Sequence, residues 1–225
     1  EALDRSPSAA AGSERYWVLD PLDGTKGFLR NGQYAVALAL IIEGRAVVGV
    51  LGCPNLPDDP WHAHGPKGCI FVAVHGQGAY QRTLDYPAER RVHVSPTADA
   101  ARAVYCESSE AGHSSHADSA RAARLLAIAA PPLRMDSQAK YAVVARGEAA
   151  IYLRLPADPA YVEKVWDHAP GSLLVREAGG EVTDARGEPL DFSHGRLLRR
   201  NIGVVATNGP LHHRVLAAVR TALGW

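Results

Sequence analysis

Two aspartates spaced three residues apart carry the strongest chemical signal in this chain. They lie in residues 20–25 (DPLDGT), where Pro21 stiffens the turn between Asp20 and Asp23. Both carboxylates can therefore point to one side, with the Leu22 carbonyl beside them. Hard oxygen donors of this kind suit Mg²⁺, which keeps several waters and joins the phosphate oxygens of a substrate. An isolated acidic turn is usually an Asx-type turn, but the complete string after a predicted strand favours a metal site.

The residues after the second aspartate suit a phosphate group. Gly24 permits close approach of the backbone to a ligand, and Thr25 supplies a hydroxyl, while backbone N–H groups after the turn could cradle an anion. One shared carboxylate can hold two metal ions about 3.5–4 Å apart, which is the arrangement used for in-line displacement at phosphorus. The string therefore predicts metal-assisted hydrolysis of a phosphate monoester by water, with no covalent intermediate.

A third acid, Asp167, directly precedes a predicted helix over residues 168–178 that ends at the glycines 179–180. Its simplest interpretation is the N-cap of that helix. The N-terminal end of a helix also favours an anion, so a phosphate near it would gain from the helix dipole. Asp167 can serve both as cap and as metal ligand only if its carboxylate is shared between the two roles.

Two kinds of elements must position these acids. The first half alternates apolar runs with turn signals, which predicts an antiparallel sheet with hairpin turns at residues 43–44 and 75–78. A stretch rich in Pro and Asp, 53–67, is expected to be a loop. The predicted strands of this half are 15–20, 34–42, 45–51, 70–74 and 79–81.

From about residue 95 the pattern changes to alternating strands and helices, which predicts a smaller α/β unit. Its predicted strands are 104–106, 133–135, 150–153, 181–183 and 202–206. Its predicted helices are 118–128, capped by Asp118 or Ser119, then 140–146, 168–178 and a final helix with an apolar face of Leu211, Val215, Leu216, Val219 and Leu223. We therefore divide the chain into 1–14 as a loop, 15–95 as the sheet region with the metal motif, and 96–225 as a nucleotide-binding region, with the site between the last two.

Composition excludes several function classes. The 225 residues carry 24 basic and 24 acidic side chains, so the chain lacks the basic character of a nucleic-acid binder. No apolar run reaches transmembrane length, and we expect no membrane partner. Cys53, Cys69 and Cys106 form no C-x-x-C pair and are expected to be buried free thiols in a cytoplasmic or organellar compartment. The pairs His62/His64 and His113/His116 lack the partners of a zinc site.

Residues 20–28 (DPLDGTKGF), followed downstream by 166–169 (WDHA) and 177–180 (EAGG), resemble the Li⁺-sensitive, Mg²⁺-dependent phosphatases that include inositol monophosphatase and fructose bisphosphatase. Four further strings resemble one branch, the eukaryotic 3′(2′),5′-bisphosphate nucleotidases. These strings are 53–56 (CPNL), 112–116 (GHSSH), 135–141 (MDSQAKY) and 152–156 (YLRLP). The resemblance runs from about Arg15 to the C-terminus and implies the layered α/β fold of that superfamily.

The resemblance also implies residue roles and a reaction. Two or three Mg²⁺ ions would be held by the metal acids and the Leu22 carbonyl, with Asp20 bridging, and Thr25 would orient the attacking water. The substrate would be 3′-phosphoadenosine 5′-phosphate, which would give AMP and phosphate and would link the protein to sulfur assimilation, with 3′-phosphoadenylyl sulfate as a second candidate. Residues implied to hold this nucleotide are Gly24, Thr25, His113, Ser137, Lys140, Arg154 and Asp167. The complete protein is expected to be a monomer.

The chain departs from the family in one respect. Family members carry helices before the DPxDGT motif, together with a metal-binding glutamate and an aspartate that helps to activate water, whereas only 19 residues precede Asp20 here. We therefore expect the natural N-terminal region to be absent, and these residues alone to be poorly soluble and nearly inactive. Two other functions stay open, which are an inositol phosphate or polyphosphate 1-phosphatase with the same metal core, and a non-catalytic phosphonucleotide-binding protein.

Overall fold

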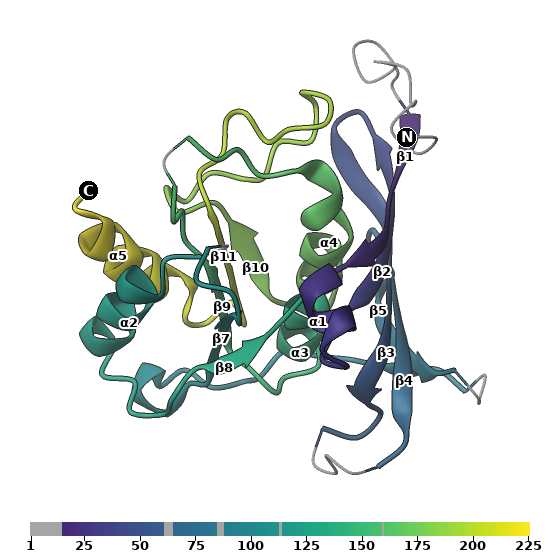
Figure 1. Ribbon diagram of the computed structural model, residues 1–225, viewed down its shortest axis with the longest axis horizontal. Helices are drawn as coiled ribbons and strands as arrows, with labels where there is room; N and C mark the ends of the chain where they lie inside the picture. Colours follow the sequence, from purple (N-terminus) through teal and green to yellow (C-terminus); the bar gives the residue numbers. More distant parts are fainter. Residues whose placement is uncertain (1–14, 61–64, 85–87, 113, 159) are drawn as a thin grey trace.

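The computed structural model describes residues 15–60, 65–84, 88–112, 114–158 and 160–225. These residues form two β-sheets, one of six strands in the order β1-β2-β3-β4-β5-β6 and one of five in the order β10-β11-β9-β7-β8. Figure 1 shows helices α3 and α4 between the two sheets and helices α2 and α5 on the far side of the second sheet. The predicted layered α/β architecture is thus observed.

The first sheet is antiparallel throughout, as the hairpin signals predicted. Glu43 and Gly44 at the turn between β2 and β3 both have positive φ angles, of 49° and 73°. This is the backbone requirement of a tight hairpin turn whose twist matches the strands. The strands are β1 (Arg15–Asp23), β2 (Ala35–Ile42), β3 (Arg45–Pro57), β4 (Lys67–Val74), β5 (Gly78–Thr83) and β6 (Arg90–Arg91).

The prediction of a loop over residues 53–67 is wrong at both ends, because β3 continues to Pro57 and β4 begins at Lys67. Cys53 and Leu56 are buried, and Cys53 lies opposite Cys69 in the ladder. Between Cys53 and Pro57 the register to β4 shifts. Proline lacks the N–H needed in a regular central strand, and this irregular stretch is where a strand tolerates it.

The second sheet contains β7 (Tyr105–Ser108), β8 (Leu133–Met135), β9 (Ile151–Arg154), β10 (Glu181–Thr183) and β11 (Val204–Thr207). Strand β7 runs parallel to β8 and β9, whereas β11 is antiparallel to both of its neighbours. The helices are α1 (Thr25–Leu29), α2 (His116–Leu125), α3 (Ala139–Ala145), α4 (Ala169–Glu177) and α5 (His212–Leu223), with short 3-10 turns at Ala100–Arg102 and Val165–Asp167. The predicted alternation of strands and helices is therefore present, although α1 was not predicted.

The predicted start of α2 at Asp118 or Ser119 is wrong. The helix begins at His116, and its N-cap is Ser115, whose side chain accepts a hydrogen bond from the Asp118 N–H. The Ser115 hydroxyl also contacts the Asp118 carboxylate at 2.6 Å. Ser115 is thus the cap, and Asp118 lies in the first turn, where the helix dipole favours an acid. The Ser115 N–H is bonded to the Leu155 carbonyl, so the reciprocal bond of a capping box is not made.

Helix α3 fills the space between the two sheets. Every one of its residues is buried, and Tyr141 at its centre is completely inaccessible. The ring of Tyr141 meets that of Tyr152 edge to face, with ring centroids 4.9 Å apart. A helix with no solvent-facing side must have its polar groups satisfied inside the protein. For this reason the surroundings of its lysine, Lys140, bear directly on the site.

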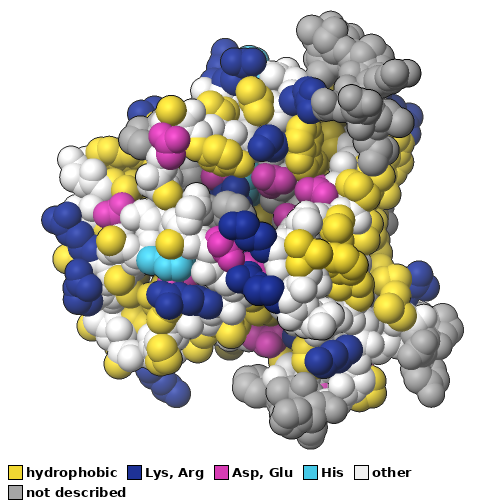
Figure 2. Space-filling view, in the orientation of Figure 1, with side chains coloured by type: hydrophobic (Ala, Val, Ile, Leu, Met, Phe, Trp, Pro, Cys, Tyr) yellow, Lys and Arg dark blue, Asp and Glu magenta, His cyan; other side chains and the backbone are white. Residues whose placement is uncertain are grey.

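The outer face of the first sheet is apolar where β1 and β2 meet. Trp17, Leu19 and Val36 point away from the core, with exposed fractions of 56%, 45% and 41%. Hydrophobic side chains follow this side of the molecule in Figure 2. The three cysteines are buried free thiols, as predicted. Within the described ranges, no helix has both the length and the apolar character needed to cross a membrane.

Candidate active site

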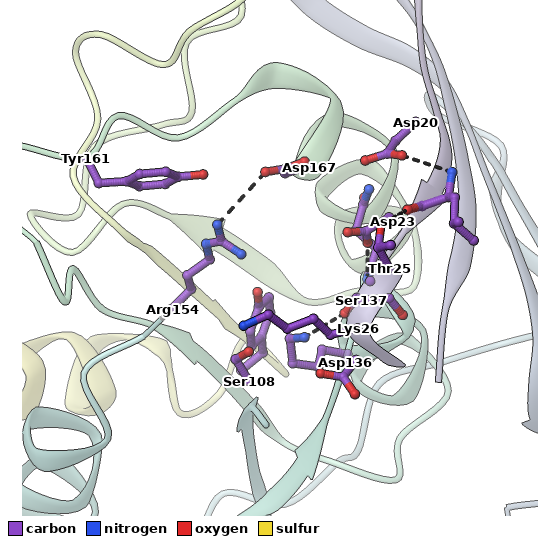
Figure 3. Close-up of a pocket in the computed structure, with 15 residues that line it drawn as sticks. Asp20, Asp23, Thr25, Lys26, Ser108, Asp136, Ser137, Arg154, Tyr161 and Asp167 are labelled. Atoms are coloured by element: carbon purple, nitrogen blue, oxygen red, sulfur yellow. Dashed lines mark hydrogen bonds and ion pairs between the residues drawn. The ribbon is translucent and has the colours of Figure 1, made fainter. Parts of the chain in front are cut away.

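A pocket of about 350 Å³ opens between the two halves of the chain. The end of β1 forms one side, and the loop before α3, the end of β9 and the turn before α4 form the other (Figure 3). Four acids line it, of which Asp20, Asp23 and Asp167 are grouped together, and its cations include Lys140 and Arg154, which are largely buried. The remaining polar or aromatic lining includes Thr25, Lys26, Ser108, Asp136, Ser137, Gln138, Tyr152 and Tyr161.

The three acids gather at one point. One carboxylate oxygen from each of Asp20, Asp23 and Asp167 lies within 4.8 Å of the other two. The ladder between β1 and β2 shifts register between Asp20 and Asp23, which allows both side chains to face the same side of the strand. The Asp20 carboxylate accepts the Leu22 N–H at 3.0 Å, and the Leu22 carbonyl accepts the Thr25 hydroxyl at 3.3 Å. The turn is thus held from within.

Burial raises the pKa of each of these acids above its ordinary value. For Asp23, the positive charge of Lys140 and the Gln138 N–H partly offset this rise. Three desolvated carboxylates within 4.8 Å of one another also repel as anions. A divalent cation between them would offset both the desolvation of the charges and their mutual repulsion. The donor set consists of oxygen atoms, which is the set that Mg²⁺ prefers. The residues present therefore fit a hard divalent metal ion.

The interpretation of Asp167 as a helix cap is wrong. Asp167 ends the 3-10 turn Val165–Asp167, and the N-cap position of α4 is taken by His168, with no capping hydrogen bond from a side chain. The short turn places Asp167 one residue before the cap, so its carboxylate is not used by the helix. It faces the pocket instead, with its Oδ2 atom 3.9 Å from Nη2 of Arg154.

Lys140 is buried inside the protein, with an exposed fraction of 3%. Its ammonium group donates hydrogen bonds to the carbonyls of Met135 and Ser137, at 3.1 and 2.7 Å. Burial lowers its pKa to about 8 despite the neighbouring charge of Asp23. Ser137 has a positive φ of 65° and accepts the Ala139 N–H on its hydroxyl. The backbone of this loop is therefore shaped around the lysine.

Arg154 is also largely buried and is held by a carboxylate. Its Nε atom donates to Oε1 of Glu163 at 2.8 Å, and 14% of its side chain is exposed. Burial alone would raise the pKa of Glu163, but its hydrogen bond to His168 and the charges of His168 and Arg154 lower the pKa to about 2. Glu163 is thus an anion that keeps Arg154 paired inside the protein.

Gly24 joins the two halves at the metal motif. It has a φ of 82°, and a Cβ atom there would lie 2.8 Å from the Cβ of Ser137. A second contact between the two halves is the hydrogen bond from the backbone N–H of Gln138 to the Asp23 carboxylate. Gly24 thus allows close packing against Ser137, whereas its predicted contact with a ligand stays a prediction.

Several lining residues were not predicted. Lys26 pairs with Glu110 at 2.9 Å, and Tyr161 has its ring near two cations, Arg154 at 5.9 Å and Lys164 at 5.4 Å. Lys26 lies within the motif of residues 20–28, so the sequence held a signal that it is near the site. Ser108 and Tyr161 reach the pocket only through the topology of the second half and have no local signal. His113, predicted to hold nucleotide, lies outside the described residues.

The pocket lies between an antiparallel sheet and a mixed α/β unit. In it, the DPLDGT turn at the end of a strand faces the WD pair before a helix. This combination is typical of the inositol monophosphatase class of folds. Residues 1–223 match the model of the inositol monophosphatase family, and the chain belongs to this family. The resemblance found in the sequence is thereby confirmed.

Relatives and solved structures agree with this assignment. The chain is 47% identical to the 3′(2′),5′-bisphosphate nucleotidase of Emericella nidulans and 46% identical to that of Schizosaccharomyces pombe, over 99% and 96% of its length. It spans 67% and 62% of the length of these two relatives. Among solved structures, inositol monophosphatase from Anabaena is 25% identical with a TM-score of 0.66, covering 93% of this chain and 73% of that one. The extragenic suppressor protein suhB from Bartonella henselae is 27% identical with a TM-score of 0.69, covering 93% of this chain and 70% of that one.

Proposed function

We propose that this protein hydrolyses the 3′-phosphate of 3′-phosphoadenosine 5′-phosphate in a Mg²⁺-dependent reaction, giving AMP and phosphate. The observation that carries the proposal is the division of one pocket into an acidic pole and a cationic pole. Asp20, Asp23 and Asp167 form the first, and Lys140 and Arg154 form the second. A substrate with two phosphates on one nucleoside needs both poles. The names of the relatives with 46–47% identity support the same choice.

The acidic pole is proposed to bind the metal. The carboxylates of Asp20, Asp23 and Asp167 would hold it together with the free lone pair of the Leu22 carbonyl. When bound, Mg²⁺ supplies charge stabilisation at phosphorus and lowers the pKa of a bound water. The Thr25 hydroxyl donates to the Leu22 carbonyl, so its oxygen lone pairs are left to accept a hydrogen bond from the attacking water and orient it. Gly24 and Thr25 would present backbone N–H groups to the scissile phosphate.

The cationic pole is proposed to hold the rest of the nucleotide. Lys140 and Arg154 would bind the second phosphate, and Ser137 would contact the ribose, with His113 as a further candidate. Arg154 presents a planar fork of donors, which matches phosphate geometry, whereas Lys140 acts as a point charge. We infer that this pole separates a nucleoside bisphosphate from a sugar monophosphate, because only the former brings a second phosphate to Lys140 and Arg154.

Replacing Lys140 by methionine tests this separation while keeping the buried volume. We expect KM for 3′-phosphoadenosine 5′-phosphate to rise about 10- to 100-fold, since a charge-assisted contact contributes roughly 1.5–3 kcal/mol. Activity on inositol 1-phosphate should change less, because that substrate has no second phosphate. The matched control is Lys67→Met at the exposed start of β4. Equal losses on both substrates would favour the inositol phosphate function instead.

Metal dependence is tested by removal and by competition. Phosphate release should cease in EDTA and return with Mg²⁺, because the acidic pole then regains its cation. Millimolar Li⁺ should inhibit, since a small monovalent ion can occupy one cation position without supplying the second charge. Steady-state rates at fixed Mg²⁺ and increasing Li⁺ give the measurement. Undiminished turnover in Li⁺ would count against the proposed branch while leaving phosphatase activity intact.

The second candidate is an inositol phosphate phosphatase, which the structural similarity to inositol monophosphatase from Anabaena favours. A colorimetric phosphate assay over 3′-phosphoadenosine 5′-phosphate, 3′-phosphoadenylyl sulfate, inositol 1-phosphate and inositol 1,4-bisphosphate decides between the two. Selective release from the nucleotides supports the proposal. Nucleotide binding by calorimetry without release of phosphate from any substrate would show a binding protein in place of an enzyme.

A further inference from the structure

One buried carboxylate lies behind the pocket and contacts it only through other side chains. Glu163 is not part of the pocket lining, and 6% of its side chain is exposed. Its Oε1 atom accepts the Nε–H of Arg154 at 2.8 Å, and its Oε2 atom lies 3.0 Å from Nε2 of His168. Arg154 ends β9, whereas His168 is the N-cap residue of α4. Glu163 therefore ties together two elements that meet at the pocket.

The contact fixes which edge of Arg154 faces the pocket. A guanidinium group is planar, with its donors in a fixed fork. Because Glu163 takes the Nε edge, the Nη groups are directed toward the pocket, where Nη2 lies 3.9 Å from Oδ2 of Asp167 (Figure 3). Without an acceptor at Nε, this long side chain would gain rotamer freedom that binding must remove again.

Glu163 is itself held on two further sides. His168 is fully buried, and its Nδ1 atom lies 2.8 Å from the hydroxyl of Tyr141 in the central helix. The backbone carbonyl of Glu163 accepts the Leu198 N–H at 2.8 Å. A carboxylate fixed through both its side chain and its backbone provides a rigid reference for Arg154.

We propose that Glu163 is a positioning residue, which orients Arg154 toward the anionic group of the substrate without touching the substrate. The inference rests on the proposed function, in which Arg154 binds a phosphate of the nucleotide. Charge alone predicts the opposite effect. A negative charge beside Arg154 weakens the attraction of that cation for a phosphate, so a purely electrostatic Glu163 would tighten binding when neutralised, whereas a positioning Glu163 would loosen it.

Calorimetric titration with 3′-phosphoadenosine 5′-phosphate in EDTA measures this without turnover. Glu163→Met keeps the volume but removes the acceptor, and we expect it to weaken binding about tenfold. Glu163→Gln keeps an acceptor for Nε and should stay within about threefold of the original protein. In an Arg154→Ala background, Glu163→Met should add no further loss, because the two residues act as one unit.

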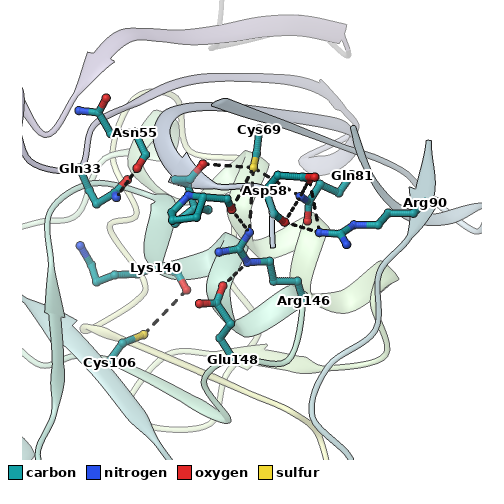
Figure 4. A network of polar contacts seen from close by, with 12 residues as sticks. Gln33, Asn55, Asp58, Cys69, Gln81, Arg90, Cys106, Lys140, Arg146 and Glu148 are labelled. Atoms are coloured by element: carbon teal, nitrogen blue, oxygen red, sulfur yellow. Dashed lines mark hydrogen bonds and ion pairs between the residues drawn. The ribbon is translucent and has the colours of Figure 1, made fainter. Parts of the chain in front are cut away.

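The matched control is Glu148→Gln. Glu148 also pairs with a buried arginine, Arg146 (Figure 4), and neither of these two residues lines the pocket. Its substitution should change the melting temperature without changing nucleotide affinity. Tighter binding in both Glu163 variants, a full additive loss in the double variant, or an equal loss in Glu148→Gln would each overturn the proposal. Should Glu163→Met not fold, Glu163→Asp takes its place, since it withdraws the acceptor by one methylene.

Failure of the proposed function has a different signature. If the protein binds nucleotide in EDTA but releases no phosphate in Mg²⁺, the proposed enzymatic activity is refuted. The affinities of the Glu163 and Arg154 variants can still be compared in that case. If the original protein binds no nucleotide, the proposed function fails, and the ¹H–¹⁵N signal of the Arg154 Nε–H group still reports on its orientation. A slowly exchanging signal that is lost in Glu163→Met supports positioning. An unchanged signal in that variant overturns it.

Discussion

In the full-length protein, Asp23→Asn is expected to lower the turnover of 3′-phosphoadenosine 5′-phosphate by about 10³-fold while leaving the protein folded. The substitution removes one charge from the acidic pole but keeps an oxygen that can accept the Gln138 N–H. Burial raises the pKa of Asp23 and so disfavours its charged form. The melting temperature in EDTA should therefore stay equal or rise. Phosphate release and thermal melts with and without Mg²⁺ provide the two measurements.

The thermal melts separate a metal role from a structural one. Added Mg²⁺ should stabilise the original protein, because a ligand that binds only the folded state raises its stability. The Asp23→Asn variant should gain much less. Asp191→Asn, a partly exposed acid paired with Arg200 away from the pocket, is the control and should behave like the original protein. A folded Asp23→Asn protein with normal turnover would refute the assignment of the metal acids.

Gly171→Ala should destabilise the protein strongly, although alanine is the better helix former. A Cβ atom at Gly171, in α4, would lie 2.2 Å from Cδ2 of Tyr141. The ring is fully buried, and moving it would break its hydrogen bond to His168. Overpacking of this kind costs about 1–3 kcal/mol and more where the neighbour cannot move. We expect a loss of about 3 kcal/mol, which corresponds to a melting temperature lower by roughly 6–12 °C in a chain of this size.

Gly112→Ala is the matched control for the overpacking experiment. Its added Cβ would have no atom within 4 Å, and its φ is not in the left-handed region. Chemical denaturation of both variants gives the difference in unfolding free energy. If the unfolding free energy falls no more in Gly171→Ala than in Gly112→Ala, α4 and α3 can move apart at little energetic cost.

Much of the first half could be predicted because its signals are local. The hairpin at residues 43–44 and the grouping of Asp20 with Asp23 follow from turn chemistry and spacing within a few residues. The end of β3 could not be predicted in this way. Its prolines suggest a loop, and the pairing of Cys53 with Cys69 and of Pro57 with Lys67 across the sheet shows that the strand continues.

The cationic side of the site depends on long-range packing and was less predictable. A lysine is usually exposed at the protein surface, yet Lys140 lies on a helix that is buried between two sheets. Asp167 has the sequence context of a helix cap, and the 3-10 turn that frees its carboxylate leaves no clear mark in the sequence. Glu163 has no motif of its own, because its importance comes from β9 and α4 meeting in space.

The hydrogen bond from the Gln138 N–H to the Asp23 carboxylate joins residues that are 115 positions apart. Hairpins of the first sheet close short loops, whereas this contact must wait until the second half has docked, since closing long loops is entropically slow. We therefore expect the acids of β1 and Lys140 of α3 to come together only after the two halves have docked. During refolding we expect strand signals to recover before catalysis does, so that enzymatic activity marks the completion of the native state more strictly than circular dichroism.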